Sequence, residues 1–285
     1  SHAGFPVTDT LRRDDADADD GFRDLADKIT RESEFRCNNY KDRCVRRRIA
    51  VRMRARGTAT YAQYADLLDA DAGEYGHLID VLTVNVTKFF RNPNTFAVAA
   101  QSVVPELWRR VGNIDVWSAG SASGEEAYSM AALFYDHARV AGELDHLGRV
   151  RVLGSDIDRG SLEAADRAMY LPASFADTAP EVLDRLFPQL GERRTVAPAI
   201  RAITSFERRD ILQDPPAPSS FDLVACRNVV IYLDRDTQER LLDSLYDALR
   251  PGGFLIMGHV ETLFGKARRF LTPVALRERI YRKAL

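Results

Sequence analysis

The chain has 285 residues, 45% of them hydrophobic, and its 40 basic and 42 acidic side chains give a net charge of −2. This length can bury one large core and a smaller one, and no apolar run reaches the roughly 18 residues that a membrane span needs. We therefore expect a cytoplasmic enzyme without a secretory signal, and the spacing of the three cysteines and five histidines predicts no metal site.

The chain begins with an acidic segment, residues 1–20, that contains the aspartate-rich run Asp14–Asp20. Such a run is typical of disorder, so no structure is expected there. Residues 21–88 then show helical spacing in four short stretches, which predicts a small all-α N-terminal domain. The expected helices are Phe22–Arg31, Lys41–Arg56, Tyr61–Asp69 and Glu74–Thr83.

The second of these helices is strongly basic. Arg48, Arg52 and Arg56 are spaced four residues apart, and this spacing predicts a cationic stripe along the helix. Three interpretations remain open: the stripe docks an acidic protein surface that carries the substrate, it binds nucleic acid, or it is a solvated face without a partner. We favour the acidic protein surface and expect no nucleic acid.

Residues 89–108 are interpreted as a connecting segment. From residue 109 to 285, strands alternate with helices, and this alternation predicts a doubly wound parallel α/β sheet. The expected strands are Ile114–Trp117, Val150–Gly154, Phe221–Cys226 and Phe254–Gly258, followed by an edge strand within Val274–Lys283. The expected helices between them are Glu125–Ala141, Ser161–Met169 and Thr237–Leu249.

Four prolines break this alternation between residues 170 and 209, where we expect an inserted β-subdomain. A short helix, Glu181–Phe187, is expected there. The stretch Arg193–Arg208 alternates in the manner of one or two antiparallel strands.

The junction between the first strand of the sheet and the helix after it is the most informative segment. Gly120 and Gly124 let the backbone approach a ligand closely, and the helix then opens with Glu125 and Glu126. No Lys or Arg follows the glycines, and two acids would repel a phosphate, so the turn favours a cationic ligand. S-adenosylmethionine carries a sulfonium and an ammonium, and Asp156, at the end of the next strand, can bind its ribose. The alternative is an ordinary strand-to-helix turn capped by acids.

With these segments together, the chain resembles the chemotaxis receptor methyltransferases of the CheR family. The resemblance rests on landmarks in the family's order along the sequence: Thr83–Arg91, the Gly-Glu-Glu helix start at Gly124, Ser155–Asp158, Cys226–Leu233, Gly252-Gly253 and Gly258–Glu261. It implies a Rossmann-like methyltransferase sheet with a small β insertion, preceded by an all-α domain. It also implies an antiparallel final hairpin.

The resemblance implies which residues contact S-adenosylmethionine. By matching positions, these are Asn85, Thr87, Arg91, Gly120, Glu126, Asp156, Asp210, Ile211, Arg227 and Asn228. The family often has Asn-Leu where this chain has Asp210-Ile211, which puts a side-chain contact there in doubt.

The implied reaction is esterification of receptor glutamates, with S-adenosylhomocysteine as the product. A glutamate has an ordinary pKa of about 4.3 and is already ionised at neutral pH, so alignment of the reactants is the main requirement. Arg91 and Tyr232 are the residues that we expect to align them. A surface salt bridge is the alternative role for Arg91, and a core position is the alternative for Tyr232.

The expected partner is the cytoplasmic helical region of chemoreceptors, and we expect a monomer. In the family the insertion contacts the receptor, and some members grip a receptor tail peptide with a glycine-containing loop. This chain offers only Gly191 there, which favours a member that does not depend on the tail. Two other classes remain as alternatives: a methyltransferase that acts on a different protein or a small molecule, and a non-catalytic cofactor-sensing module.

Overall fold

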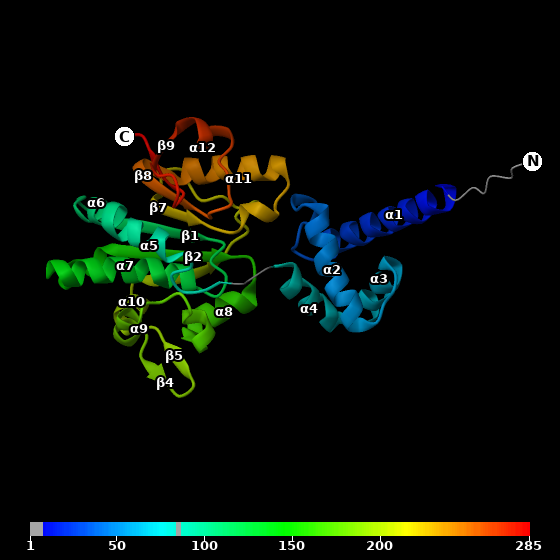
Figure 1. Ribbon diagram of the computed structural model, residues 1–285, viewed down its shortest axis with the longest axis horizontal. Coiled ribbons are helices and arrows are strands. Elements are labelled where there is room, and N and C mark those ends of the chain that lie inside the picture. The colour runs from blue at the N-terminus through cyan, green and yellow to red at the C-terminus, as the bar shows by residue number, and fades with distance from the viewer. Residues whose placement is uncertain (1–7, 84–86) are drawn as a thin grey trace, which may run out of the picture. The chain divides into compact units, whose positions relative to one another are not determined.

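The computed structural model describes residues 8–83 and 87–285, and the chain divides into two compact units (Figure 1). The first contains the described residues up to Thr83 together with the short segment Tyr232–Asp234. The second contains the remaining described residues. None of the helices in the described ranges is long and apolar enough to cross a membrane.

The first unit is entirely helical. Its helices are α1 (Thr8–Glu32), α2 (Asp42–Arg56), α3 (Tyr61–Ala70) and α4 (Ala72–Leu82), with a 3₁₀ turn at Cys37–Asn39. Gly57 ends α2 in the left-handed conformation (φ 68°), and its N–H donates to the carbonyls of Met53 and Arg54. Thr60 begins α3 with a capping box that Gln63 completes. Local sequence signals therefore set these boundaries.

The core of the first unit consists of side chains that all four helices contribute. Fully buried members are Leu25, Ile29, Ile49, Tyr64, Leu68, Leu78 and Leu82. The expected disorder of residues 1–20 is wrong from Thr8 onward, because α1 begins there and includes Asp14–Asp20. Residues with high helix propensity, such as Leu11 and Ala16, lie between the acidic residues in the sequence. Their propensity favours continuation of α1 towards its N-terminus. Residues 1–7 lie outside the described part of the chain.

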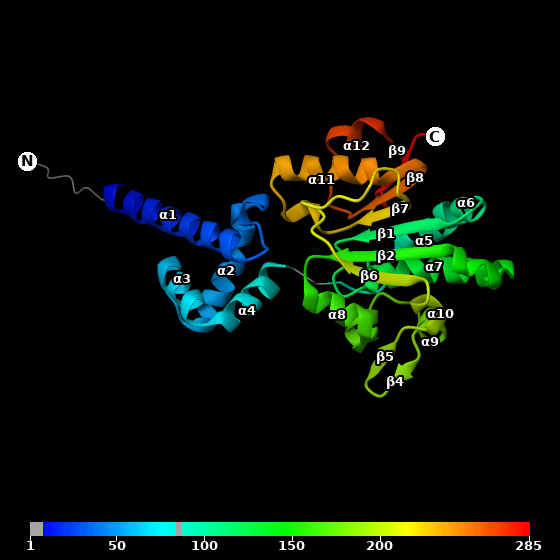
Figure 2. The same cartoon turned by 180° about the vertical axis from the view of Figure 1, so that it is seen from behind.

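The second unit is built on a seven-stranded sheet with the order β6-β2-β1-β7-β8-β10-β9, whose strands β6, β2, β1 and β7 lie side by side in Figure 2. The strands are β1 (Ile114–Ala119), β2 (Val150–Asp156), β6 (Thr204–Arg208), β7 (Phe221–Cys226), β8 (Leu249–Met257), β9 (Leu271–Ala275) and β10 (Ile280–Lys283). The pairs among β6, β2, β1, β7 and β8 are parallel, and β10 is antiparallel to both of its neighbours. The doubly wound sheet and the antiparallel final hairpin are confirmed. The chain reverses its winding at β1, and ligands of such sheets bind at the carboxyl ends of the strands there.

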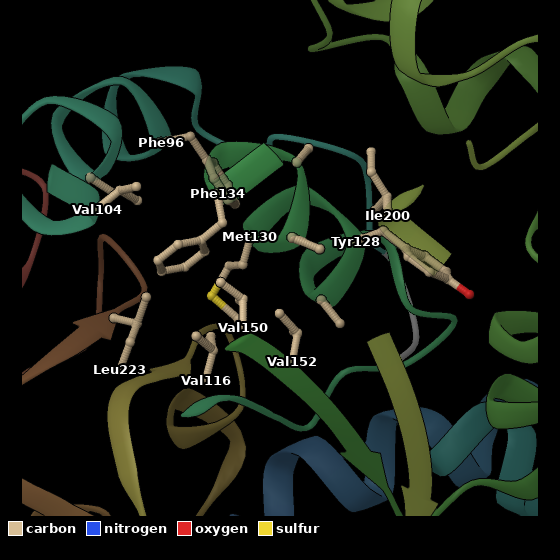
Figure 3. Packing of buried hydrophobic residues seen from close by; sticks show 14 of the residues in the cluster. Phe96, Val104, Val116, Tyr128, Met130, Phe134, Val150, Val152, Ile200 and Leu223 are labelled. Atoms are coloured by element: carbon tan, nitrogen blue, oxygen red, sulfur yellow. The ribbon is translucent and has the colours of Figure 1, made fainter. Parts of the chain in front are cut away.

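Helices cover both faces of this sheet. They are α5 (Pro93–Val98), α6 (Val104–Trp108), α7 (Glu125–Ala141), α8 (Arg159–Arg167), α11 (Arg235–Ala248) and α12 (Gly265–Phe270). On one face, Met130 and Phe134 of α7 pack against Val116, Val150 and Leu223 of the strands (Figure 3). The alternate strand residues point to the opposite face, where α11 contacts β8.

The interpretation of residues 89–108 as a connecting segment is wrong. Most of this stretch is helical, as α5, a π-helical turn at Ala99–Val103, and α6. Val103 and Leu107 are fully buried in the core of the second unit. The π turn precedes Pro105, which lacks the N–H that an α-helix would use at that position. Residues 93–108 are therefore a helical part of the sheet unit and not a connecting segment.

The insertion forms a small antiparallel sheet with the order β3-β5-β4, from β3 (Met169–Tyr170), β4 (Gln189–Leu190) and β5 (Arg193–Thr195). It also contains the short helices α9 (Pro180–Leu186) and α10 (Pro198–Arg201). The prediction that the insertion extends to residue 209 is wrong, because β6 pairs with β2 in the large sheet and runs parallel to it. Alternating side chains identify a strand, but they do not distinguish a parallel edge strand from an antiparallel hairpin.

Candidate functional site

The turn after β1 is fixed by backbone hydrogen bonds to β2. The N–H groups of Gly120 and Ser121 donate to the Ser155 carbonyl oxygen at 2.8 and 2.9 Å. Gly120 has φ +74°, and a Cβ there would lie 2.6 Å from Cγ2 of Val229. Glycine is therefore required both by the backbone conformation and by the side chain of the loop after β7. The sequence predicted close approach at Gly120, but it did not show that Val229 is what approaches.

The two glutamates that open α7 have different environments. Glu125 is buried and accepts hydrogen bonds from the hydroxyls of Ser123 (2.7 Å) and Ser174 (3.3 Å), and burial raises the pKa of its carboxyl group. Glu126 is less enclosed, and one of its oxygens accepts a hydrogen bond from the Ser118 hydroxyl at 2.9 Å. Glu126 is therefore the more accessible carboxylate of the pair.

Asp156 ends β2 beside the glycine turn. Its two oxygens accept hydrogen bonds from the N–H groups of Ala122 (2.8 Å) and Asp158 (3.0 Å). The residue is 9% exposed, and burial raises its pKa while these two N–H groups act in the opposite direction. A carboxylate oxygen has two lone pairs, so each oxygen can still accept a hydroxyl hydrogen bond. Asp156, the residue predicted to bind the ribose, is therefore held in place by a hydrogen bond from the glycine turn.

Arg227, directly after β7, forms an ion pair and hydrogen bonds with several parts of the site. Its guanidinium lies 3.3 Å from a Glu126 carboxylate oxygen and donates to the Arg91 carbonyl (2.6 Å) and to Oδ1 of Asn92 (2.7 Å). Asn228 follows with φ +62°, a conformation that residues other than glycine seldom adopt. Arg227 therefore connects the strand end to α7 and to the Arg91 segment.

The segment before α5 carries the first predicted cofactor contacts. Phe89 is fully buried, and its N–H donates to the Ser174 carbonyl at 2.9 Å. The Phe90 N–H donates to the Ser129 hydroxyl at 2.9 Å. These hydrogen bonds fix the backbone that leads to Arg91, while the Phe89 ring packs in the core and the partly buried Phe90 packs against it. Thr87 is half-buried, and Asn85 lies outside the described residues.

Asp210 and Ile211 follow β6 at the same edge of the sheet. The Asp210 carboxylate accepts a hydrogen bond from the Leu212 N–H at 2.9 Å, which closes a turn of its own backbone. Ile211 is buried. The side chain of Asp210 is thus used locally, in keeping with the doubt about a side-chain contact there.

Tyr232 is held by the first unit. Its carbonyl oxygen accepts a hydrogen bond from the Lys41 N–H at 2.9 Å, and the next residue, Leu233, forms an isolated antiparallel bridge with Tyr40. The guanidinium carbon of Arg48 lies 4.5 Å from the centre of the Tyr232 ring, a cation–π arrangement. Tyr232 is half-buried, and its role as an alignment residue stays a prediction beside the alternative of a core position.

The predicted cationic stripe on α2 is not an open surface. Arg48 is 5% exposed and donates to the Leu82 carbonyl. Arg52 forms a bidentate pair with the buried carboxylate of Glu74, with both N–O distances 2.8 Å, and Arg56 donates to the same carboxylate at 3.1 Å. Arg48 is thus buried, and Glu74 neutralises Arg52 and Arg56, so the three side chains do not form a stripe of unpaired positive charge.

Three further basic side chains of α2 are exposed on the opposite side of the helix. They are Arg43, Arg47 and Arg54, with the exposed Val51 among them. At about 100° per residue, Arg52 lies only about 20° around the helix from the buried Val45, so helix geometry alone would have placed it on the buried side.

The residues that the structure describes include no group of three or more His, Cys, Asp or Glu side chains arranged to hold a metal ion. Cys37 and Cys226 are buried, and burial raises the pKa of both thiols.

Comparison with known proteins identifies two family models along the chain. The model described as "CheR methyltransferase, SAM binding domain" matches residues 85–278, and the one described as "CheR methyltransferase, all-alpha domain" matches residues 20–83.

Individual proteins are similar over most of the chain. A chemotaxis protein methyltransferase of Salmonella typhimurium is 32% identical over 89% of this chain and 87% of its own length. Chemotaxis protein methyltransferase 2 of Pseudomonas aeruginosa is 31% identical over 84% of this chain and 85% of its own length. An uncharacterized 104.1 kDa protein of Rhodobacter capsulatus is 37% identical over 79% of this chain, which spans only 24% of that longer protein.

Proposed function

The chain belongs to the CheR methyltransferase family, and from this premise we propose that it transfers a methyl group from S-adenosylmethionine to glutamate carboxylates of chemoreceptors. The observation that carries the proposal is the convergence of three strand ends in the sheet unit. The glycine turn after β1, Asp156 at the end of β2, and Arg227-Asn228 after β7 all lie at the carboxyl edge where the winding reverses.

The residues at this edge fit S-adenosylmethionine. Asp156 keeps lone pairs for ribose hydroxyls, and Glu126 offers a carboxylate to the ammonium of the methionine part. The N-terminal turn of α7 carries two acids and follows a turn without Lys or Arg, so the local charge suits a cation and disfavours a phosphate. When bound, the cofactor supplies a methyl group on a sulfonium, an electrophile that needs no metal.

The chain's own residues then need only to align the reactants. A substrate glutamate is ionised at neutral pH and requires no general base. Arg91 offers planar, forked donors suited to a carboxylate, and its backbone is fixed through Arg227 and through the packed Phe89 and Phe90. Tyr232, whose carbonyl oxygen accepts a hydrogen bond from Lys41, is the second alignment residue that we propose. Alignment in such cases contributes about 7 to 11 kcal/mol to lowering the barrier.

We assign receptor docking to the exposed face of α2. Arg43, Arg47 and Arg54 give it positive charge, and Val51 gives it an apolar contact. An acidic helical surface is complementary to this face, and the cytoplasmic helical region of chemoreceptors is the partner that we propose. The reaction would then take place in the cytoplasm, with the enzyme as a monomer. The insertion carries a single glycine in its β4–β5 turn, Gly191, which agrees with an enzyme that does not depend on a receptor tail peptide.

The proposal is tested with a purified cytoplasmic fragment of a chemoreceptor and S-adenosylmethionine, followed by peptide mass spectrometry. Methylated glutamates are expected, and they should disappear when those receptor positions are changed to glutamine. They should decrease at limiting cofactor when the enzyme carries Asp156→Asn. A methyl group on another residue type would contradict the assignment. Binding of S-adenosylmethionine without receptor methylation would favour a different protein or a small molecule as the substrate.

A further inference from the structure

Glu261, in the turn after β8, is a buried carboxylate whose hydrogen-bond partners are backbone groups. The residue is 2% exposed. One carboxylate oxygen accepts a hydrogen bond from the Val230 N–H at 2.9 Å, and the other from the Gly258 N–H at 2.6 Å. Burial raises the pKa of its carboxyl group, while the surrounding backbone N–H groups, including those of Asn228 and Val229, act in the opposite direction. Each oxygen of this one side chain thus accepts a hydrogen bond from a backbone N–H group.

These donors come from two separate segments of the sheet unit. Gly258 directly follows β8, while Val230 lies in the loop after β7 together with Asn228 and Val229. A Cβ at Gly258 would lie 2.6 Å from the Glu261 carboxylate oxygen and 3.0 Å from the Asn228 nitrogen, so the close approach needs glycine there. Glu261 therefore joins the ends of two neighbouring parallel strands.

The loop that Glu261 holds bears directly on the proposed cofactor site. Asn228, one of the proposed contacts, has φ +62°, and such a conformation persists only where the surroundings enforce it. Val229 fills the space beside Gly120 in the glycine turn. The carbamoyl group of Gln238 donates to the Val230 carbonyl at 2.9 Å and fixes the loop from its other side.

We propose that Glu261 is a positioning residue for the cofactor site: its carboxylate holds the Asn228–Val230 loop so that Asn228 faces the cofactor and Val229 supports the glycine turn. The inference rests on the proposed function, since it concerns the same site. Glu261 has no role in the chemistry itself, and its removal acts through the loop.

The chain offers a matched control at the other end of β7. Asp222 is also a buried carboxylate, and it accepts hydrogen bonds from the Asp115 N–H at 2.9 Å and from Arg250 at 2.6 Å. It lies at the amino end of the strand, away from the proposed cofactor contacts. Asp222→Asn should therefore lower stability without changing cofactor affinity.

The test compares Glu261→Gln with Asp222→Asn by calorimetric titration of S-adenosylhomocysteine and by steady-state kinetics. Glutamine replaces one carboxylate oxygen by an NH₂ group, which cannot accept the hydrogen bond of the N–H donor that faces it. We expect the Kd and the KM for S-adenosylmethionine to rise about tenfold or more, with kcat at saturating cofactor within about threefold of wild type. Glu261→Asp, which keeps the charge on a shorter side chain, should give a smaller rise.

Val229→Ala alters the same loop at a different side chain and leaves the buried carboxylate of Glu261 in place. It should weaken cofactor binding about threefold or more if support of the glycine turn is the means of action, even where Glu261→Gln fails to fold. Unchanged cofactor Kd in Val229→Ala and in a folded Glu261 variant, or an equal change in Asp222→Asn, would overturn the inference. Failure of the wild-type protein to bind S-adenosylhomocysteine would instead contradict the proposed function.

Discussion

The guanidinium of Arg227 lies 3.3 Å from the carboxylate of Glu126, so two residues that we predicted as separate cofactor contacts are partners of each other. The same guanidinium donates to the Arg91 carbonyl, which brings a third predicted residue into the group. A ligand ammonium at Glu126 would therefore share the carboxylate with an arginine that is already in place. The site is organised by its own ion pair before any ligand contributes.

Replacing Asp156 by Asn should weaken cofactor binding and lower stability, because the new NH₂ group cannot accept one of the two N–H hydrogen bonds that the carboxylate accepts. The hydrogen bonds of a carboxylate to ribose hydroxyls are worth about 1.5 to 3 kcal/mol, which corresponds to roughly 10- to 100-fold in affinity. Calorimetric titration of S-adenosylhomocysteine measures the change. Asp158→Asn is the control, because Asp158 caps α8 and asparagine caps equally well. Equal affinities in the two variants would contradict the ribose role.

Replacing Gly120 by Ala should destabilise the sheet unit. The residue has φ +74°, and the new Cβ would lie 2.6 Å from Val229, so we expect a loss of about 1 to 3 kcal/mol in the free energy of unfolding. Urea denaturation checks this value. Adding Val229→Ala should restore part of the loss by relieving the contact but not the backbone strain. No difference between the single and double variants would show that the contact does not matter.

Replacing Arg91 by Ala should lower turnover by roughly tenfold or more and leave cofactor affinity largely intact, if its main role is to align the substrate carboxylate. Arg91→Lys keeps the charge but loses the planar fork, so it should recover only part of the activity. Steady-state rates at saturating cofactor, with a parallel binding titration, separate the two effects. Wild-type turnover in Arg91→Ala would remove this residue from the mechanism.

Reversing the charge of Arg43 and Arg47 should weaken receptor docking in a salt-dependent way. Both side chains are exposed on α2, and loss of charge complementarity should raise the KM for receptor about three- to tenfold at low salt and less at high salt. Arg277→Glu, at an exposed position in the other unit, tests whether charge change alone has an effect. A KM for receptor that is insensitive to the α2 reversals would exclude this face as the docking surface.

The buried carboxylate of Glu74 should make the helical unit sensitive to acid. Hydrogen bonds from Arg52 hold the pKa of Glu74 below its ordinary value of 4.5. Because the folded-state pKa is the lower one, the stabilisation is present above about pH 4.5 and is lost as the pH falls through the folded pKa.

Glu74→Gln should remove this pH dependence and lower stability by about 3 kcal/mol, since it leaves Arg52 and Arg56 without their charged partner. Thermal unfolding between pH 3 and 7 provides the measurement. A variant with wild-type stability at pH 7 would show that the ion pairs contribute little.

The sequence predicted the boundaries of helices and strands best where the local hydrophobic pattern is compatible with only one type of secondary structure. The strand Phe221–Cys226 and the helix Glu125–Ala141 have the predicted boundaries, because a buried apolar run and an amphipathic period each point to one structure. Strand β6 was misassigned because alternation does not specify its partner. The helical structure over residues 93–108 was not predicted, although Pro93 and Pro105 each lie in the first turn of a helical segment, where proline is favourable.

The site was harder to predict than the fold. Sequence order located Asp156 and Gly120, since each ends a strand at the switch point. It did not show that Arg227 pairs with Glu126, nor that Glu261 accepts a hydrogen bond from the loop after β7, because these contacts join residues far apart in the chain. Side-chain partnerships across a sheet depend on register and on loop conformation, which a single sequence does not specify.

The central claim is methyl-ester formation on receptor glutamates, and transfer of a radiolabelled methyl group from S-adenosylmethionine to receptor-rich membranes tests it most directly. The account predicts label on the receptor band that mild base releases as volatile methanol, because a carboxylate ester is hydrolysed where a methylated nitrogen is not. Label that resists base, or no label while the enzyme still binds the cofactor, would contradict it.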